Sequence, residues 1–211
     1  MKRLFVVLMV LVMVIGLGLD SLSAAVGSKG GINLARIRFT EEDADDWQGI
    51  LGFQIGVFCS IKIKNRLFIQ PEVFYVNKGV SLKGTYLGEE LKSIVKFTYI
   101  EVPLLLKCVL SSEDRAFQPA VFFGVYRAFK INTKSIMEYE GDRVEEDITD
   151  QVKKKDDGIV LGISADWKMG KGKLVMDLRY NLGIKNIRKE TTFEGYEVKH
   201  KALSFMVGYS F

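Results

Sequence analysis

Large apolar side chains alternate with small or polar ones along much of this chain, most strictly along its last stretch, Lys201 to Phe211. A period of two predicts a β-strand with one apolar face, because successive side chains point to opposite sides of a strand. In a soluble protein that face would pack on a core, whereas in a membrane barrel it would face lipid. The apolar face of this stretch consists of Leu203, Phe205, Val207, Tyr209 and Phe211.

Eight stretches have the residue types of strands, and each can supply the roughly 9–11 residues that a tilted transmembrane strand needs. No long helical period interrupts them. In order along the chain they are approximately residues 26–39, 49–63, 66–80, 96–109, 117–131, 158–168, 173–184 and 198–211.

The connections between these stretches alternate between short and long without exception. Membrane barrels show this pattern, with tight periplasmic turns and longer outer loops, and an even strand number leaves both chain ends on the periplasmic side. The sequence therefore predicts an all-β fold, an eight-stranded antiparallel up-and-down transmembrane β-barrel. The short connections are 64–65, 110–116 and 169–172, and the long, charged ones are 40–48, 81–95, 132–157 and 185–197.

The first residues have the form of a secretory signal peptide. Lys2 and Arg3 precede an uncharged apolar run at 4–19, and small residues follow it,. The run is shorter than the roughly 20 residues of a membrane-spanning helix. Cleavage after Ser23 or after Ala25 both fit. We expect residues 1–25 to be a cleaved signal peptide and residues 26–211 to form a barrel domain in the outer membrane of a Gram-negative-type bacterium.

Composition excludes some functions. The net charge of +4 is too small to indicate nucleic-acid binding, and two cysteines do not make a disulfide scaffold,. Alternation places Cys59 and Cys108 on the lipid face with one strand between them. Their Cα atoms would then lie about two strand spacings, near 10 Å, apart, beyond the roughly 7 Å limit of a disulfide. We expect two free thiols.

The same alternation predicts a charged interior. A barrel of eight strands is just wide enough for side chains to fill it, so we expect a plug in which Arg179 bridges Glu72, Glu101 and Asp177. A proton or ion path is the alternative, since charges inside a membrane protein often mark one. The set is rich in acids, so protonated or hydrated carboxylates are expected. The predicted inward polar network is Glu72, Glu101, Lys107, Asp166, Asp177 and Arg179.

Three features fit a closed barrel less simply. Pro71, Pro103 and Pro119 fall inside or at the start of strands, where each removes a ladder hydrogen bond, and we expect bulges or strand starts there,. The fifth stretch is apolar on both faces. In the first stretch Arg36 and Arg38 share a face that we assign to the lumen or to the outer rim.

Candidate chemistry is sparse. His200, the single histidine, falls on the inner face near the outer end of the last stretch, with Ser204 two pleats away rather than adjacent. A lipid hydrolase would need a serine and an acid beside such a histidine. A lone histidine without thiol partners is also a poor zinc site. We expect a rim residue, with catalysis as the alternative, and no cofactor or metal.

Two loops carry runs of like charge. The first loop is acidic but lacks the glycine and spacing of a calcium loop, so we expect it to be solvated. Bridging to lipopolysaccharide through divalent cations is the alternative. The third long loop is expected to be mobile, and its lysine run to be solvated. The acidic residues are Glu41, Glu42, Asp43, Asp45 and Asp46, and the lysines are 153–155.

With these residues placed, the chain resembles the PorT-like, or porin-like, family of outer-membrane β-barrel proteins. The resemblance implies an eight-stranded outer-membrane barrel without fixing a function. The final alternation also resembles the signal by which assembly machinery recognises a last strand, which implies that role for the five apolar residues of that strand. The matching pieces are 31–33, 70–72 with Tyr75, Lys78 and Gly79, 99–105, Gly158 with Gly162, 179–180 with Gly183 and Asn186, and 209–211.

The function expected from the sequence is that of a small, non-enzymatic outer-membrane barrel with a structural or interaction role and exposed outer loops. The alternatives are an outer-membrane lipid-modifying enzyme that uses His200, a narrow diffusion pore, and an accessory barrel of a secretion apparatus. The expected partners are outer-membrane lipid, lipopolysaccharide and, during biogenesis, the barrel-assembly machinery. We expect a monomer that binds no nucleic acid.

Overall fold

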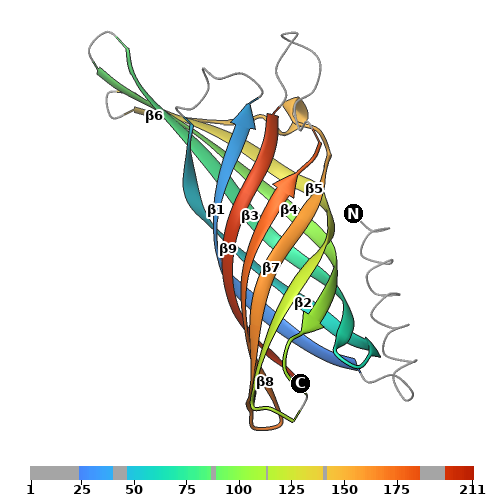
Figure 1. Cartoon of the computed structure of the whole chain (residues 1–211). Coiled ribbons are helices and arrows are strands. Elements are labelled where there is room, and N and C mark those ends of the chain that lie inside the picture. Colours follow the sequence, from blue (N-terminus) through green and yellow to red (C-terminus); the bar gives the residue numbers. More distant parts are fainter. Residues whose placement is uncertain (1–23, 40–46, 87–88, 113, 140–141, 186–197) are drawn as a thin grey trace.

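A computed structural model describes residues 24–39, 47–86, 89–112, 114–139, 142–185 and 198–211. Eight long strands form a closed antiparallel barrel (Figure 1), as the alternation predicts. Neighbours around the barrel are β4-β3-β2-β1-β9-β8-β7-β5, and β4 pairs with β5 to close it. The strands are β1 (Ala24–Phe39), β2 (Trp47–Lys64), β3 (Leu67–Tyr86), β4 (Glu89–Val109), β5 (Phe117–Tyr139), β7 (Lys155–Met169), β8 (Gly172–Gly183) and β9 (Val198–Ser210).

The two ends of the barrel differ. One end, here the turn end, holds the three short connections, and Asn65 and Gly170 take the positive φ angles (44° and 62°) that two of these tight turns need,. The start of β1 and the end of β9 also meet there, since Gly27 pairs with Ser210. The opposite end is the loop end. No helix in the described ranges is long and apolar enough to cross a membrane.

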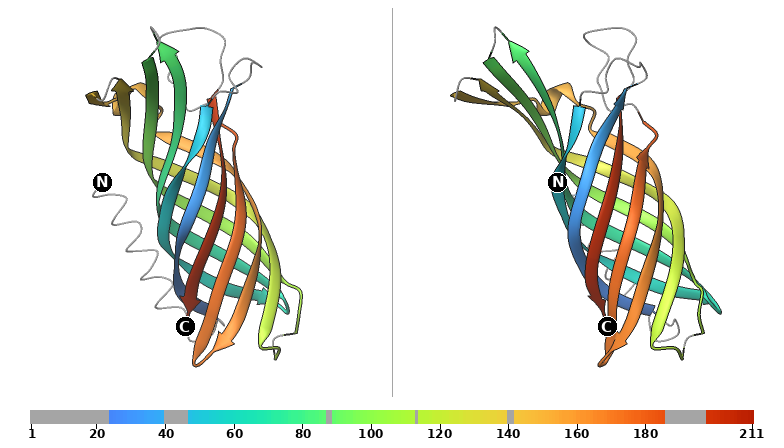
Figure 2. Two further views of the ribbon diagram at one scale, coloured as in Figure 1. Left: turned by 90° about the vertical axis from the view of Figure 1, so that its left-hand side faces the viewer. Right: turned by 60° about the vertical axis from the view of Figure 1, so that its left-hand side comes forward.

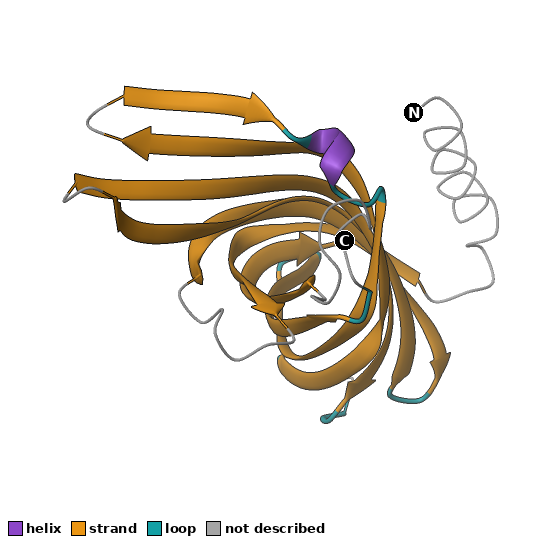
Figure 3. Ribbon diagram, turned by 90° about the horizontal axis from the view of Figure 1, so that it is seen from above, coloured by secondary structure: helices purple, strands orange, loops and turns teal. Residues whose placement is uncertain are grey.

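Three strands are longer than the sequence suggests, because β3, β4 and β5 continue far past the barrel at the loop end. A ninth strand, β6 (Asp142–Asp147), pairs with the outer part of β5, and a 3₁₀ turn, η3 (Thr149–Gln151), follows it. Together they form a sheet that projects from the barrel (Figures 2 and 3). Our expectation of loops at 81–95 and 132–157 is therefore wrong for the described residues, whereas the expected mobility of 138–157 stays a prediction.

The projecting sheet was not predicted as strands because its strand β6 consists almost entirely of charged residues. All six residues of β6 are exposed, and a strand wetted on both faces shows no apolar period. The hairpin is held by antiparallel backbone pairing of β5 with β6, and exposed ion pairs lie on the sheet. Lys134 donates to Glu145 at 2.6 Å, and Lys92 lies 3.3 Å from Glu138. The hydrogen bond from Lys134 lowers the pKa of Glu145,.

Alternation sets the two faces of the barrel as predicted. Outward positions are apolar and exposed, while inward positions are buried, including those of β5, where the sequence was ambiguous. An exposed apolar surface of this extent is what a lipid-facing wall requires. Its exposed members include Ile32, Leu34, Phe53, Ile55, Val57, Leu104, Phe123, Val125, Leu161, Ile163, Leu203 and Phe205.

The strand prolines interrupt the ladders without shifting them. Pairing between β2 and β3 runs from Phe58 opposite Glu72 to Ile61 opposite Ile69, in one register on both sides of Pro71. Pairing between β3 and β4 likewise skips Pro103 and resumes unchanged. Pro119 lies near the start of β5. The barrel therefore tolerates each lost hydrogen bond locally, and the bulges in β2–β3 and β4–β5 lie elsewhere.

Several large rings fit the narrow lumen because they face a glycine on the adjacent strand. Four buried rings show this pairing, and a Cβ atom built on any of these glycines would lie within 2.6 Å of the opposing ring. The missing side chain leaves the ring its space, as in the aromatic rescue of strand glycines. The pairs are Phe58 with Gly27, Phe74 with Gly56, Phe122 with Gly162 and Tyr126 with Gly158.

Gly162→Ala should therefore lower the free energy of unfolding by about 1–3 kcal/mol, the usual cost of overpacking. The new Cβ would lie 2.4 Å from Cζ of Phe122 and 2.6 Å from the carbonyl oxygen of Leu178. Urea titration in detergent measures the loss. Gly84→Ala is the matched control, because nothing lies within 4 Å of that Cβ. Equal effects at the two glycines would contradict the pairing.

Candidate functional site

The candidate site is the filled lumen, and its largest charge cluster joins β1, β3 and β8. Arg179 donates to both oxygens of Glu72, at 2.8 and 3.3 Å, and to Oδ2 of Asp177 at 2.8 Å. Lys29 donates to the same two carboxylates, at 2.7 Å to Glu72 and 2.5 Å to Asp177. Gln70 adds a hydrogen bond to Glu72 at 2.7 Å. Two cations and two carboxylates, all buried, thus neutralise one another.

Aromatic rings fill the space around this central cluster. The guanidinium of Arg179 lies 5.4 Å from the ring centre of Phe74 and 5.3 Å from that of Phe122. Nζ of Lys29 lies 4.8 Å from the ring centre of Phe58. These are cation–π distances, so the rings that face glycines also contact the charges. The cluster and its rings occlude the middle of the barrel.

A second cluster lies nearer the loop end. Lys78 donates to Glu101 at 2.8 Å, and the Asn181 amide donates to the other oxygen of Glu101 at 2.6 Å. The Tyr126 hydroxyl donates to Asp156 at 3.4 Å. The expected bridge from Arg179 to Glu101 is therefore wrong: Arg179 is occupied by Glu72 and Asp177, and Glu101 has its own cation on β3.

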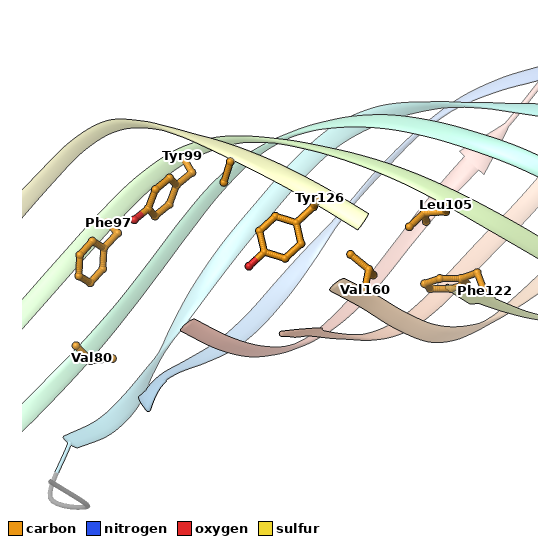
Figure 4. Close-up of a cluster of buried hydrophobic side chains, with 8 residues drawn as sticks. Val80, Phe97, Tyr99, Leu105, Phe122, Tyr126 and Val160 are labelled. Carbon is orange, nitrogen blue, oxygen red and sulfur yellow. The ribbon is translucent and has the colours of Figure 1, made fainter. Parts of the chain in front are cut away.

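Apolar side chains surround this second cluster. Val80, Phe97, Tyr99, Leu105, Phe122, Tyr126, Ala128 and Val160 form one buried group (Figure 4). The Lys78 ammonium lies 5.7 Å from the ring centre of Tyr99 and 5.4 Å from that of Tyr126. An interior of this composition is packed like a protein core rather than open like a channel.

The turn end of the lumen is more open. Lys107 donates to both oxygens of Asp166, at 2.9 and 2.8 Å, and Lys173 donates to Gln118 at 2.7 Å. These side chains line a cavity of about 280 Å³ together with Phe58, Phe68 and Ser210. The cavity ends below the central cluster, so the two ends of the lumen are separated by paired charges.

All six inward ionisable residues that the sequence indicates are buried, and the expected excess of acid is smaller than predicted, with five acids, Asp156 included, against four bases. Lys29 and Lys78 supply the missing positive charge, and sequence reasoning placed neither of them in the lumen. The inward position of Lys29 was missed because the glycines of β1 weaken its alternation. The alternation still places Lys29 on the face opposite to Ile32 and Leu34, and this could have identified it as inward. Lys78 lies on the same inward face of β3 as Glu72 and Phe74, but the sequence-based prediction of that face extended only as far as Phe74.

His200 is enclosed rather than poised for catalysis. Its ring lies edge-on to Phe97, with centres 5.0 Å apart, and its Nε2 is 3.4 Å from the Tyr99 hydroxyl. Ser204 is buried on the same strand face, and no contact joins it to His200 among the described residues. His200 lies near the loop end of β9, on its inner face, as expected, and it is 1% exposed.

The other predicted residues lie as follows. Cys59 and Cys108 are free thiols, as expected, although Cys59 is buried rather than exposed to lipid. Arg36 is exposed, which excludes the lumen and agrees with the other alternative, the outer rim, and the acidic loop lies outside the described residues. Lys153 to Lys155 precede or begin β7. No group of three metal-ligating side chains occurs in the described part of the chain.

The five terminal apolar residues all face outward on β9. Leu203, Phe205, Val207 and Phe211 are exposed, and Tyr209 donates from its hydroxyl to the Met169 carbonyl at 2.7 Å. The Phe211 ring lies edge-on to Tyr209, with centres 5.0 Å apart. This placement is compatible with both readings of the stretch, a lipid-facing surface and a recognition element.

Comparison with known proteins assigns the chain to a protein family. The model of the outer membrane protein beta-barrel domain matches residues 20–189. No curated protein sequence matches the chain.

Solved structures similar to the chain include Neisserial surface protein A (12% identity, 90% of this chain and 99% of that one, TM-score 0.46). OprG from Pseudomonas aeruginosa is similar at 13% identity, over 90% of this chain and 95% of that one, with a TM-score of 0.46. Ail of Yersinia pestis, solved with the heparin analogue sucrose octasulfate, is similar at 10% identity, over 89% of this chain and 99% of that one, with a TM-score of 0.45. Because the family model covers more than half of the sequence, the chain belongs to the outer membrane protein beta-barrel domain family and resides in the outer membrane.

Proposed function

We propose that this protein is a closed, non-enzymatic barrel that acts through its surface outside the membrane. The observation that carries the proposal is the filled lumen, in which Arg179, Lys29 and their two carboxylates cross the barrel from β1 and β3 to β8. A small ion would have to break these pairs to pass. The role then falls to the loop end, where β3 to β6 project as a sheet.

Several narrower points belong to the same proposal. We place the turn end in the periplasm and the loop end outside, as the loop lengths favour. The protein is a monomer, and its partners are outer-membrane lipid with lipopolysaccharide and the barrel-assembly machinery. Membership of the PorT-like group is supported by the sequence pieces quoted above. A lipid-modifying activity is not favoured, because the ring of His200 is buried against Phe97 and Tyr99.

Conductance in planar bilayers tests the closed lumen. We expect the purified, folded barrel to give no discrete current steps above those of a bilayer that received detergent alone. The physical reason is the cost of separating buried ion pairs, which is several kcal/mol per ion. Regular single-channel steps that disappear when the protein is digested would contradict the proposal and favour a narrow pore. A His200→Ala variant that alters the lipid profile of the outer membrane would favour the enzyme.

A further inference from the structure

Two basic residues face each other on the outside of the barrel. Arg36 on β1 lies directly opposite Lys201 on β9, and strand alternation points both toward the lipid side, in line with Leu34 and Leu203. Arg36 is exposed and Lys201 half-buried. Among the described residues, neither one makes an ion pair or a side-chain hydrogen bond. Like charges directly opposite on a sheet destabilise it, so the pair calls for an anion that the described residues do not supply.

The position of this pair indicates where the anion comes from. Directly below it on the same two strands, Leu34 faces Leu203, and Ile32 faces Phe205. These four apolar side chains are exposed on the lipid-facing wall. The two cations thus lie one step beyond the end of an apolar column, at the level where acyl chains give way to headgroups.

The rest of the loop-end rim is also basic on its outer face. Lys96 lies directly opposite Lys134 on β4 and β5. Arg127 and Lys185 share one carboxylate, that of Asp157, at 2.7 and 2.5 Å. Lys134 also pairs with Glu145, and β6 carries further exposed acids, Asp142, Glu146 and Asp147. Arg36 and Lys201 differ from these cations, because no carboxylate of the described residues pairs with either of them.

The turn-end rim has a different character. Its outward positions carry aromatic rings, with Phe117 against Trp167 at 6.1 Å and Tyr209 against Phe211 at 5.0 Å between ring centres. Aromatic belts of this kind suit an ordinary membrane–water interface. The turn-end rim carries exposed cations as well, among them Lys168 and Lys171. What distinguishes the loop end is the pair of Arg36 and Lys201, which lie directly opposite each other above an apolar column.

We infer that Arg36 and Lys201 bind a phosphate group of a phosphorylated glycolipid in the outer leaflet, whose acyl chains lie along the apolar column of Ile32, Leu34, Leu203 and Phe205. Guanidinium and ammonium groups are the usual phosphate ligands in proteins. A phosphate between them would convert a repulsive cross-strand pair into a neutralised one. This inference rests on the proposed placement of the loop end outside the membrane. It identifies a lipid that the barrel would bind next to that end.

The test compares wild type with Arg36→Gln/Lys201→Gln, and uses Lys168→Gln/Lys171→Gln as a matched control. Lys168 and Lys171 are exposed at the turn end, so the control removes the same charge from the other rim. The probes are lipid A, the same lipid after removal of its phosphates, and inorganic phosphate. Native mass spectrometry in detergent measures the lipid bound to each barrel, and thermal unfolding is followed with and without lipid.

Wild type and the control should bind lipid A equally, and Arg36→Gln/Lys201→Gln roughly thirty-fold more weakly, as expected for two lost charge contacts with an anionic membrane surface. Without lipid this variant should unfold at the same or a higher temperature than wild type, because a like-charge pair has been removed. With lipid A the order should reverse. A variant that merely misfolds would be less stable in both conditions, and that result would overturn the inference.

Two further outcomes would also overturn it. Equal binding of dephosphorylated lipid A by wild type would assign the affinity to the acyl chains, and displacement of lipid A by inorganic phosphate at equal concentration would assign the site to a free ion. Conductance distinguishes this inference from the proposed function. Conductance would contradict the closed lumen without affecting the lipid site. Failure to bind lipid A would contradict the lipid site without affecting the closed lumen.

Discussion

Glu72→Ala should lower the free energy of unfolding of the barrel by about 3–5 kcal/mol, the cost of leaving a buried charge without its partner. Glu72 accepts hydrogen bonds from Arg179, Lys29 and Gln70, and its side chain has no exposed area. After the substitution Asp177 alone would face two cations. Urea titration in lipid vesicles or detergent measures the change.

The matched control is Glu145→Ala in the projecting hairpin. Glu145 also pairs with two cations, Lys134 at 2.6 Å and Arg143 at 3.8 Å, but in water. Solvent screens such pairs, so little change in stability is expected. If both alanine variants lost equal stability, the charge network in the lumen would not be what holds the barrel wall together.

Removal of Phe211 should sharply reduce the amount of protein that reaches the outer membrane, if the last strand is read by the assembly machinery. Phe211 faces outward and is highly exposed, so it contributes little packing to the folded barrel. The expected loss thus comes from recognition rather than from stability. Quantitative immunoblotting of separated membranes after deletion of this residue gives the measurement.

Phe53→Ala is the control for this deletion. Phe53 is likewise an exposed, outward ring beside a tyrosine, at 6.0 Å from Tyr75, but it lies on β2. We expect it to accumulate almost as wild type. Both variants should fold spontaneously in detergent, where no machinery acts. A deletion variant that also fails in detergent would mean that Phe211 supports the fold itself.

The architecture could be predicted because two independent features agree. Strict alternation in 201–211 and in the other stretches sets one lipid-facing side, and the short and long connections set the up-and-down order. The projecting sheet could not be predicted in this way. Its strand β6 is charged throughout and wetted on both faces, so hydrophobic periodicity, the main signal for a strand, is absent there.

The lumen network was only half predictable for a different reason. Parity assigns Glu72, Asp177 and Arg179 to the inside, because it depends only on neighbours along one strand. Their partners depend on which strands lie opposite across the barrel, and Lys29 and Asp177 are 148 positions apart in the sequence. Alternation along one strand does not tell which side chains meet across the barrel. Lys29 was missed because β1 is weakly patterned, and Lys78 because the inner face of β3 was followed only as far as Phe74.

The pairing of four inward rings with glycines has a consequence for how such a barrel diverges. Neither member can change alone without a penalty, since a larger residue in place of glycine strikes the ring, and a smaller residue in place of the ring leaves a void. Compensated exchange, in which Phe122 and Gly162 trade places, keeps the same volume within the wall. Relatives should therefore vary at these sites two positions at a time, and an engineer who wants a pore must relieve both members of a pair together.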